Sequence, residues 1–402
     1  MGFEKLSGAW DFFLYSINFP VFKARIGDSS LKTLVFVGEH LPPRIPRMAK
    51  WLKRKYKYRI VLLCSHAGYT PAFANNSIDY TFLFRNPVHL RRILRTLPPI
   101  WVMHSFAPKS HFGNIAREML PQVQFIHDMQ DVLATYYGTN PETRWLKQEL
   151  PHEKSCLENA DGVISHSMEV NEGFRRYKIS KKPPSLFFPL YCDGDSFLNI
   201  EKKTGEEIHL VYAGGVAGSH RDAKHYGNTQ FGQLIKKLTS QGLHFHIYPS
   251  PTNVRADYEE YEILSKENPL FHFHAPVPQE KLSAELSRYH FGLLPFFKEL
   301  SEQSAAKLKF ATTLKLFNYL EAGLPVIVSK DLGFQSWIIE RYGAGMGIEL
   351  RDIESLGNLL RQRDYSIIQQ KVIQAREKLS LAKNIHRLDD FYSLVKNSAK
   401  PR

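Results

Sequence analysis

Two threonines and a lysine in the C-terminal third of the chain have the types and spacing to bind a phosphate group. Thr312 and Thr313 precede an amphipathic stretch that carries Lys315 in its first turn and reaches Gly323 where a helix would end. Threonine caps helix amides, and the free N–H groups and partial positive charge of a helix N-terminus suit a diphosphate. The same residues also fit an ordinary capped helix that leads into a strand opened by Pro325. Both interpretations remain open on this pattern alone.

The other chemically marked segment is the basic region between Lys32 and Arg117. It holds 15 Lys and Arg residues but only two acidic ones, and the rest of the chain is balanced, so it accounts for the whole formal charge of +13. Its densest part is predicted to form one helix with Trp51 among the charges, and it includes Arg44, Arg47, Lys50, Lys53 and Arg54. Such a helix either presents a solvated face or contacts an anionic membrane or acceptor, where each basic residue contributes about 1 kcal/mol. Nucleic acid is not an expected partner, because no nucleic-acid-binding motif is visible.

The elements that must position these residues are short β-rich runs that alternate with longer amphipathic stretches. In the first half, the runs cover 33–37, 59–64, 80–84, 100–104, 124–127 and 162–166. After a polar stretch they resume at 208–213, 244–248, 271–274, 291–295, 325–328 and 346–349. Continuous apolar strands that alternate with helices predict parallel sheets covered on both faces. The predicted fold class is therefore α/β, with two Rossmann-like, doubly wound domains facing a cleft.

This pattern divides the chain into five parts. We expect an N-terminal extension at 1–30, a first Rossmann-like domain at 31–190, a linker at 191–205, a second domain at 206–375 and a C-terminal helix at 376–402. Ligands of open parallel sheets bind beyond the carboxyl ends of the strands, so functional residues are expected just after each strand. Four aromatic residues of the extension could enter a membrane interface or pack on the first domain, namely Phe12, Phe13, Phe19 and Phe22.

Composition narrows the class of protein further. With 402 residues, 43% of them apolar and 23% charged, the chain has the usage of an ordinary globular protein. Its three cysteines are too few and too scattered for a disulfide scaffold or a CxxC zinc site. No apolar run reaches the roughly 20 residues that span a bilayer, and the start of the sequence lacks the pattern of a signal peptide. We therefore expect a cytoplasmic protein, either free or peripheral on the inner face of the membrane.

Seven segments, taken in order, resemble those of family 4 type retaining glycosyltransferases, which have the GT-B fold. The strongest is 311–328, which resembles the K-L-F-E-Y-L-A-A-G-x-P-V-I segment of that family. The other six are 125–128, 161–167, 186–197, 209–215, 271–278 and 289–295. Together they cover most of the chain, so the resemblance concerns both expected domains.

The resemblance implies transfer of a sugar from a nucleotide-diphosphate donor to a glycan or lipid-linked acceptor, with retention of configuration. The donor is then a co-substrate bound mainly by the second domain, the acceptor is bound mainly by the first, and no metal or other cofactor is needed. Helix-end amides and basic side chains can stabilise the leaving diphosphate, and the oxocarbenium-like centre needs nearby dipoles or anions. The implied catalytic residues are His127 and Asp128. The implied donor-binding residues are Gly214, Gly215, Arg221, Lys224, Val277, Thr312, Thr313, Lys315 and Asn318.

The sequence departs from the family pattern at positions that normally hold the donor. Phe310 and Asn318 stand in the places of two glutamates, and Gly215 stands in the place of an arginine. Arg221 and Lys224 could supply the missing cations, although lysine acts only as a point charge. These changes allow either a divergent enzyme or a catalytically weak GT-B protein that serves in sugar-nucleotide binding or assembly. A sugar-nucleotide epimerase, which shares the fold, and a transferase acting on DNA are further alternatives.

Overall fold

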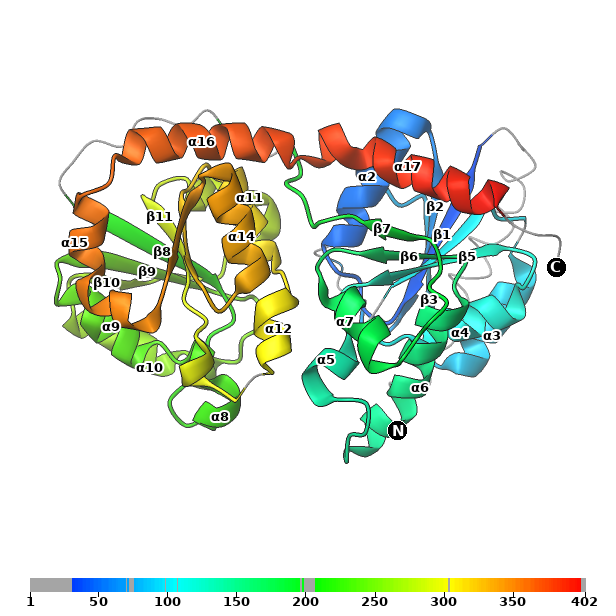
Figure 1. Cartoon of the computed structure of the whole chain (residues 1–402), viewed down its shortest axis with the longest axis horizontal. Coiled ribbons are helices and arrows are strands. Elements are labelled where there is room, and N and C mark those ends of the chain that lie inside the picture. The colour runs from blue at the N-terminus through cyan, green and yellow to red at the C-terminus, as the bar shows by residue number, and fades with distance from the viewer. Residues whose placement is uncertain are drawn as a thin grey trace, which may run out of the picture. The chain divides into compact units, whose positions relative to one another are not determined.

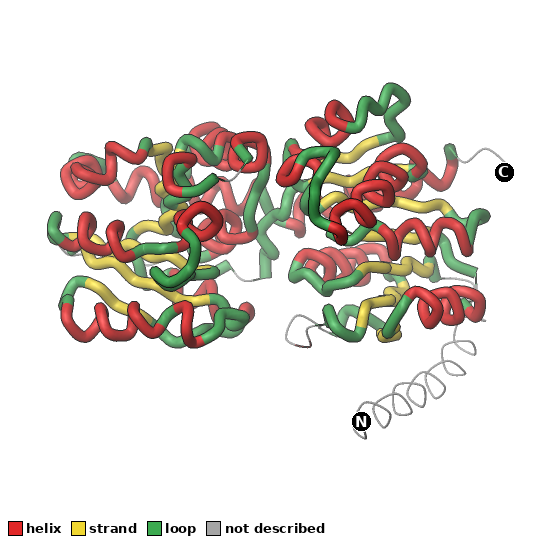
Figure 2. Tube along the Cα trace, turned by 90° about the horizontal axis from the view of Figure 1, so that it is seen from below, coloured by secondary structure: helices red, strands yellow, loops and turns green. Residues whose placement is uncertain are grey.

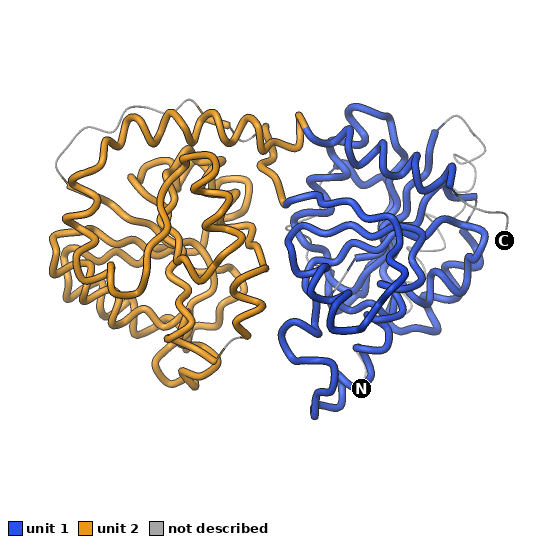
Figure 3. The backbone as a smooth tube through the Cα atoms, in the orientation of Figure 1, with its two compact units in different colours: residues 1–189, 384–402 blue, residues 190–383 orange. Residues whose placement is uncertain are grey.

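The computed structural model describes residues 31–69, 71, 76–97, 99–106, 108–195, 197–198, 207–302 and 304–398. The chain divides into two compact units, which Figure 3 colours separately. Unit 1 comprises Met1–Pro189 and Asn384–Arg402, and unit 2 comprises Leu190–Lys383. The extension expected at 1–30 and part of the linker expected at 191–205 lie outside the described residues.

Unit 1 is built on a seven-stranded sheet (Figure 1), in the spatial order β3-β2-β1-β4-β5-β6-β7. The strands are β1 (Thr33–Gly38), β2 (Arg59–Ser65), β3 (Tyr80–Phe84), β4 (Val102–Phe106), β5 (Gln124–Met129), β6 (Gly162–Ser165) and β7 (Ser185–Phe187). All neighbouring pairs are parallel. Every residue of β1, β2 and β4 is buried, as expected of central parallel strands covered on both faces.

Helices cover both faces of this sheet, as Figure 1 and the layers of Figure 2 show. The core of one face is shared with α3 (Pro87–Thr96), α4 (His111–Met119), α5 (Leu133–Tyr137), α6 (Arg144–Asn159) and α7 (Glu169–Arg176). The other face packs against α2 (Arg44–Tyr56) and α17 (Leu381–Asn397). Unit 1 is therefore discontinuous in sequence, because most of α17 belongs to the unit formed by the first half of the chain.

Unit 2 repeats this architecture with six parallel strands in the order β10-β9-β8-β11-β12-β13. The strands are β8 (Ile208–Gly214), β9 (Leu243–Pro249), β10 (Phe271–Phe273), β11 (Phe291–Leu294), β12 (Val326–Ser329) and β13 (Gly345–Ile348). The helices are α8 (Ala223–Tyr226), α9 (Gly232–Thr239), α10 (Glu259–Glu267), α11 (Gln279–Leu286), α12 (Ala305–Phe310), α13 (Leu314–Glu321), α14 (Gly333–Tyr342), α15 (Leu356–Arg361) and α16 (Tyr365–Lys378). Aromatic and aliphatic residues of the sheet, α9 and α10 form the core of one face.

Both sheets reverse their strand order once. In unit 1 the reversal lies between β1 and β4, and in unit 2 it lies between β8 and β11. Ligands of doubly wound sheets bind at such switch points, outside the carboxyl ends of the strands. The predicted α/β class, with two doubly wound parallel sheets, is confirmed, and it directs attention to the residues that follow β8 and β11.

Candidate functional site

The switch point of unit 2 brings together two residues that the sequence placed in the donor site. Gly214 ends β8 with a φ of 156°, and a Cβ atom on it would lie 2.0 Å from Cε of Lys315. The Lys315 ammonium also lies 5.8 Å from the ring centre of Tyr212 and 5.7 Å from that of Phe296. Burial lowers the pKa of Lys315 to about 8, so a nearby anion would restore a charge that the protein interior disfavours.

The N-terminus of α13 has the cap that the sequence predicted. Thr313 is extended, with φ −132° and ψ 149°, and its hydroxyl accepts a hydrogen bond of 3.1 Å from the backbone N–H of Lys315. The Thr312 hydroxyl oxygen is buried and has no hydrogen-bond partner among the residues that the structure describes. Gly323 follows the helix with a φ of 74°, the left-handed conformation expected at a helix end. The local geometry of both helix ends is thus as predicted.

Tyr319 is a residue of this site that the sequence did not single out. Its hydroxyl accepts a hydrogen bond from the N–H of Ala213 (3.0 Å) and donates one to the carbonyl of Leu293 (3.2 Å). It therefore joins the carboxyl ends of β8 and β11, where direct pairing stops after Gly292 and Val211. A usable signal was its position four residues after Lys315, which places both side chains on the same face of α13.

The other predicted donor residues are held by different partners. Arg221 makes a double ion pair with Asp257, at 2.7 and 3.0 Å, and Lys224 pairs with Glu302 at 3.3 Å. Gly215 accepts a hydrogen bond from the Tyr212 hydroxyl at its carbonyl (2.8 Å), and Val277 lies between β10 and α11. The two cations that could replace the missing arginine are thus paired with carboxylates, and their role in binding a donor stays a prediction.

The positions that depart from the family pattern lie in and beside α13. The carbonyl of the buried Asn318 side chain accepts a hydrogen bond from Gln279 (3.3 Å), and Phe310 ends α12. Glu321 is also buried, and its carboxylate accepts hydrogen bonds from the N–H of Asp193 (2.8 Å) and the hydroxyl of Ser283 (3.3 Å). Glu321 therefore holds segments of unit 2 together through these hydrogen bonds.

His127, the predicted catalytic histidine of unit 1, is fully buried in β5. The Ser110 hydroxyl lies 3.2 Å from its Nε2 atom, and the Ser105 hydroxyl lies within hydrogen-bond distance of its Nδ1 atom. Burial lowers the pKa of His127 to about 3, so the ring is neutral at physiological pH. Both ring nitrogens are satisfied from within unit 1, and a catalytic role for His127 stays a prediction.

Asp128, the other predicted catalytic residue, lies at the centre of a buried polar network. Arg44 Nε donates to its carboxylate at 2.9 Å, and the same guanidinium donates to the carbonyls of Phe188 (2.9 Å) and Pro189 (3.1 Å). Burial alone would raise the pKa of Asp128, but Arg44 and a hydrogen bond from His104 hold this pKa well below its usual range. Asp128 is therefore charged at physiological pH, and Arg44 connects α2 and the last residues before unit 2 to this carboxylate in β5.

His104 extends this network to the end of the chain. Its Nε2 atom lies 3.4 Å from the Asp128 carboxylate, and its Nδ1 atom lies 2.6 Å from the Tyr392 hydroxyl. A neutral ring with its proton on Nε2 donates to the carboxylate and accepts from the tyrosine, so every bond has a donor and an acceptor. Asp128 is therefore a structural centre of unit 1 in the described state, linking α2, β4, β5 and α17.

Helix α2 carries the predicted basic cluster, but not all of its cations face outwards. Arg44 and Arg47 are buried, so neither contributes to a membrane-facing surface. Arg44 forms an ion pair with the buried carboxylate of Asp128 instead. Lys53 pairs with Asp79 at 2.5 Å. The remaining cations surround Trp51, with Lys50, Arg54 and Lys55 lying 5.7, 4.7 and 5.9 Å from its ring.

No helix within the described residues is both long enough and apolar enough to cross a membrane.

Unit 2 holds a cavity of about 450 Å³ beside α9, lined by Phe231, Leu234, Phe297 and Ile353 among others. Its lining does not include Gly214 or Lys315, so it is separate from the candidate site at the switch point.

Part of unit 2 resembles a known family in sequence. Residues 227–388 match the family model for the glucosyltransferase 3-like, C-terminal domain. The match includes α13 with Lys315 and most of unit 2. No curated protein is significantly similar to the chain in sequence.

Several solved structures superpose on the chain over both of its units. A sucrose-phosphate synthase from Thermosynechococcus elongatus superposes with a TM-score of 0.63 at 14% identity, over 92% of this chain and 100% of that one. A glycosyltransferase from Rickettsia africae gives a TM-score of 0.63 at 12% identity, with the same coverage. The UDP-GlcNAc 2-epimerase from Neisseria meningitidis, bound to UDP-GlcNAc, gives 0.53 at 12% identity, over 90% of this chain and 100% of that one.

These comparisons define the class of protein. The two units have the fold of GT-B glycosyltransferases, and the C-terminal region resembles a glycosyltransferase domain in sequence as well. Because the epimerase shares the fold, the fold alone does not separate a transferase from an isomerase; the family match favours the transferase.

Proposed function

We propose that the chain is a glycosyltransferase that moves a sugar from a nucleotide-diphosphate donor to a glycan or lipid-linked acceptor with retention of configuration. One observation carries the proposal: Lys315, in the first turn of α13, lies beside Gly214 at the switch point of the unit 2 sheet. Helix α13 belongs to the region that matches a glucosyltransferase-like domain. The name of the matching family makes glucose the first donor sugar to test.

In this proposal the diphosphate lies against Gly214, where the absent side chain leaves room for the Lys315 stem. The Lys315 ammonium supplies the cation, and the first N–H groups of α13 supply further donors to the leaving group. The buried Thr312 hydroxyl would gain the partner that it lacks. No metal is needed, because these groups can stabilise the charge that develops on the diphosphate, and transfer should therefore continue in the presence of EDTA.

A thermal-shift panel of nucleotide sugars tests the proposal, because a ligand that binds only the folded state raises the unfolding midpoint. We expect one nucleotide series, with UDP, GDP or ADP, to stabilise the wild type, and Lys315→Ala to weaken the response. Lys266→Ala, an exposed lysine of α10, is the matched control and should respond as the wild type does. A panel without any stabilising nucleotide would refute donor binding.

The acceptor is proposed to lie at an anionic membrane surface that α2 contacts. Support comes from three cations of α2 that lie around the buried Trp51, namely Lys50, Arg54 and Lys55. Liposome sedimentation should show binding that requires anionic lipid and falls with salt. Reversing those three charges should abolish it; equal binding of the variant, or binding insensitive to salt, would contradict the electrostatic account.

A second candidate is a GT-B protein that binds a sugar nucleotide without turnover. The observation that favours it is the absence of carboxylates at Phe310 and Asn318, together with the enclosure of His127 between two serines. Nucleotide-sugar binding by the full chain, with neither transfer to glycan or lipid acceptors nor hydrolysis of the donor, would select this candidate.

A further inference from the structure

One face of the unit 2 sheet carries a cluster of histidines that no step of the proposed transfer uses. The strands β8, β9 and β10, with the residue that follows β10, place alternate residues on this face, because side chains of a strand point to opposite faces in turn. The histidines are His209, His244, His246, His272 and His274. The sequence already shows this alternation, as H-F-H-I-Y at 244–248 and F-H-F-H at 271–274, although these histidines were not among the predicted site residues.

The histidine rings stack on one another and are joined by hydrogen bonds between ring nitrogens. His209 stacks on His244 with ring centres 4.3 Å apart, and His246 stacks on His272 at the same spacing. Nδ1 of His209 lies 2.9 Å from Nε2 of His246, and Nδ1 of His244 lies 3.0 Å from Nε2 of His272. Each such bond needs one acceptor nitrogen, so at least one ring of each pair is neutral.

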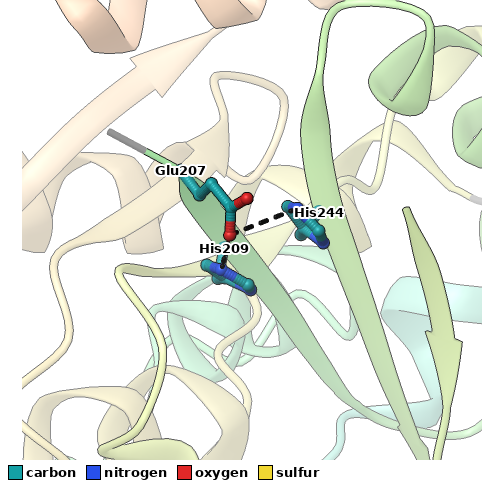
Figure 4. Close-up of side chains that lie close together, drawn as sticks. All are labelled: Glu207, His209 and His244. Atoms are coloured by element: carbon teal, nitrogen blue, oxygen red, sulfur yellow. Dashed lines mark ion pairs between the residues drawn. The ribbon is translucent and has the colours of Figure 1, made fainter. Parts of the chain in front are cut away.

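At the edge of this cluster, Glu207 reaches between two of the rings (Figure 4). Its Oε2 atom lies 3.6 Å from Nε2 of His209 and 3.7 Å from Nε2 of His244. Of the described residues, these three form the one group of His, Cys, Asp or Glu side chains that could hold a metal ion, with all ligand atoms within 4.8 Å of one another. Two ligands of a tetrahedral zinc ion, each about 2.05 Å from it, are about 3.3 Å apart, which is close to both distances from Glu207.

We propose that Glu207, His209 and His244 form a binding site for a divalent transition-metal ion, with Zn²⁺ as its natural occupant. Two imidazoles and one carboxylate are ligands that zinc accepts, and they leave a fourth position for water. Glu207 is the exposed member, with 73% of its side chain accessible, so an ion can enter from solvent. All three cysteines are buried and do not compete for it.

The surrounding histidines prepare the two ligands for metal. When Nδ1 of His209 donates to His246, and Nδ1 of His244 donates to His272, the Nε2 atom of each ring is unprotonated and has a lone pair for a metal ion. His246 can donate a hydrogen bond in the same way, because its own Nδ1 atom lies 3.0 Å from Nε2 of His274. Metal-binding histidines are held in this way by a partner on the other ring nitrogen, and loss of that partner typically weakens binding 10- to 100-fold.

The site lies at the opposite end of the sheet from the proposed donor site. His209 is near the start of β8 and Gly214 is at its end, which separates them by about 17 Å at the usual strand rise. The ion would tie the entry of β8 to β9 and stabilise unit 2 without contacting the diphosphate. The inference is therefore independent of the proposed function and does not alter the expectation that transfer needs no metal.

Isothermal titration of the full chain with Zn²⁺ alone, after treatment with EDTA, tests the inference. We expect one ion per chain, and a rise in the unfolding midpoint with zinc. Glu207→Gln and His209→Gln should each abolish this binding, and His272→Phe should weaken it 10- to 100-fold. Glu207 is exposed, so its variant reports on the site even where His209→Gln fails to fold.

The control is His225→Gln, which removes an exposed histidine that pairs with Asp222 at 2.9 Å. This variant should bind zinc as the wild type does. Co²⁺ provides a second readout, because a four-coordinate ion at the site gives intense visible absorption that Glu207→Gln should remove. Absence of zinc binding in the wild type, or wild-type affinity in Glu207→Gln, would overturn the inference.

Discussion

The lowered pKa of Lys315 leads to a specific dependence of donor binding on pH. Burial brings this pKa to about 8, so in the free protein the ammonium is present below that pH and is lost above it. A bound diphosphate favours the charged form and raises the pKa again. Nucleotide-sugar affinity should therefore be highest below pH 8 and should fall as the pH rises above it.

The size of this effect follows from the position of the pKa. With a pKa of about 8, roughly nine-tenths of the Lys315 side chains are protonated at pH 7 and roughly one-tenth at pH 9. If only the protonated form binds, the dissociation constant rises about tenfold between these pH values, or about 1.4 kcal/mol.

The assay is calorimetric titration, at pH 7, 8 and 9, with whichever nucleotide sugar stabilises the wild type. Lys315→Arg is the matched control, because arginine keeps its charge over this range and any ionisation of the nucleotide affects both proteins equally. Parallel pH profiles for the wild type and Lys315→Arg would refute the assignment of the cation to Lys315.

Three further substitutions test the packing around the two candidate regions. Arg44→Met removes the cation beside the buried carboxylate of Asp128, and the free energy of unfolding in urea should fall by about 3–5 kcal/mol. Tyr319→Phe removes the hydroxyl that joins two backbone groups at the switch point, with an expected loss of about 1–3 kcal/mol in the same assay. Gly214→Ala places a Cβ atom 2.0 Å from the Lys315 side chain at a φ of 156°, and should weaken nucleotide-sugar binding in the calorimeter.

Each of these variants has a control. Adding Asp128→Leu to Arg44→Met should recover stability, because an isolated buried charge costs more than an apolar pair; no recovery would argue against an uncompensated carboxylate. Tyr226→Phe changes an exposed tyrosine and should leave unfolding unchanged. A Cβ atom on Gly232, at the start of α9, meets nothing within 4 Å, so Gly232→Ala should keep the ligand affinity of the wild type; equal losses at both glycines would contradict the role of Lys315.

The fold was predictable because its signals are local. Runs of apolar residues located twelve strands, for example 33–37 for Thr33–Gly38 and 325–328 for Val326–Ser329. The strand that was missed, Ser185–Phe187, has three residues and is partly or fully exposed, so it lacks the buried run that marks a central strand. Helix α12 has six residues, which give too little periodicity for a prediction from sequence.

The candidate site was predictable only where neighbours in sequence determine it. The cap at Thr313 and the left-handed Gly323 depend on adjacent residues, and both were found. The burial of Arg44 was not predicted, because its partner Asp128 is 84 residues away. A run of basic residues in the sequence does not indicate which of them pairs with a distant carboxylate. Tyr319 lies one helical turn after Lys315, which puts it on the same helix face, but its two hydrogen-bond partners lie on strands far from it in the chain and were not predictable.

The discontinuous composition of unit 1 has a consequence for biosynthesis. A nascent chain exposes the β-sheet of unit 1 long before α17, whose buried residues include Leu388 and Tyr392, leaves the ribosome. At usual translation rates, the residues of unit 2 that separate them take about 10–40 s to make. During that interval an apolar sheet face and the Asp128 network lack the cover of α17, so unit 1 completes its fold only after unit 2 has been synthesised.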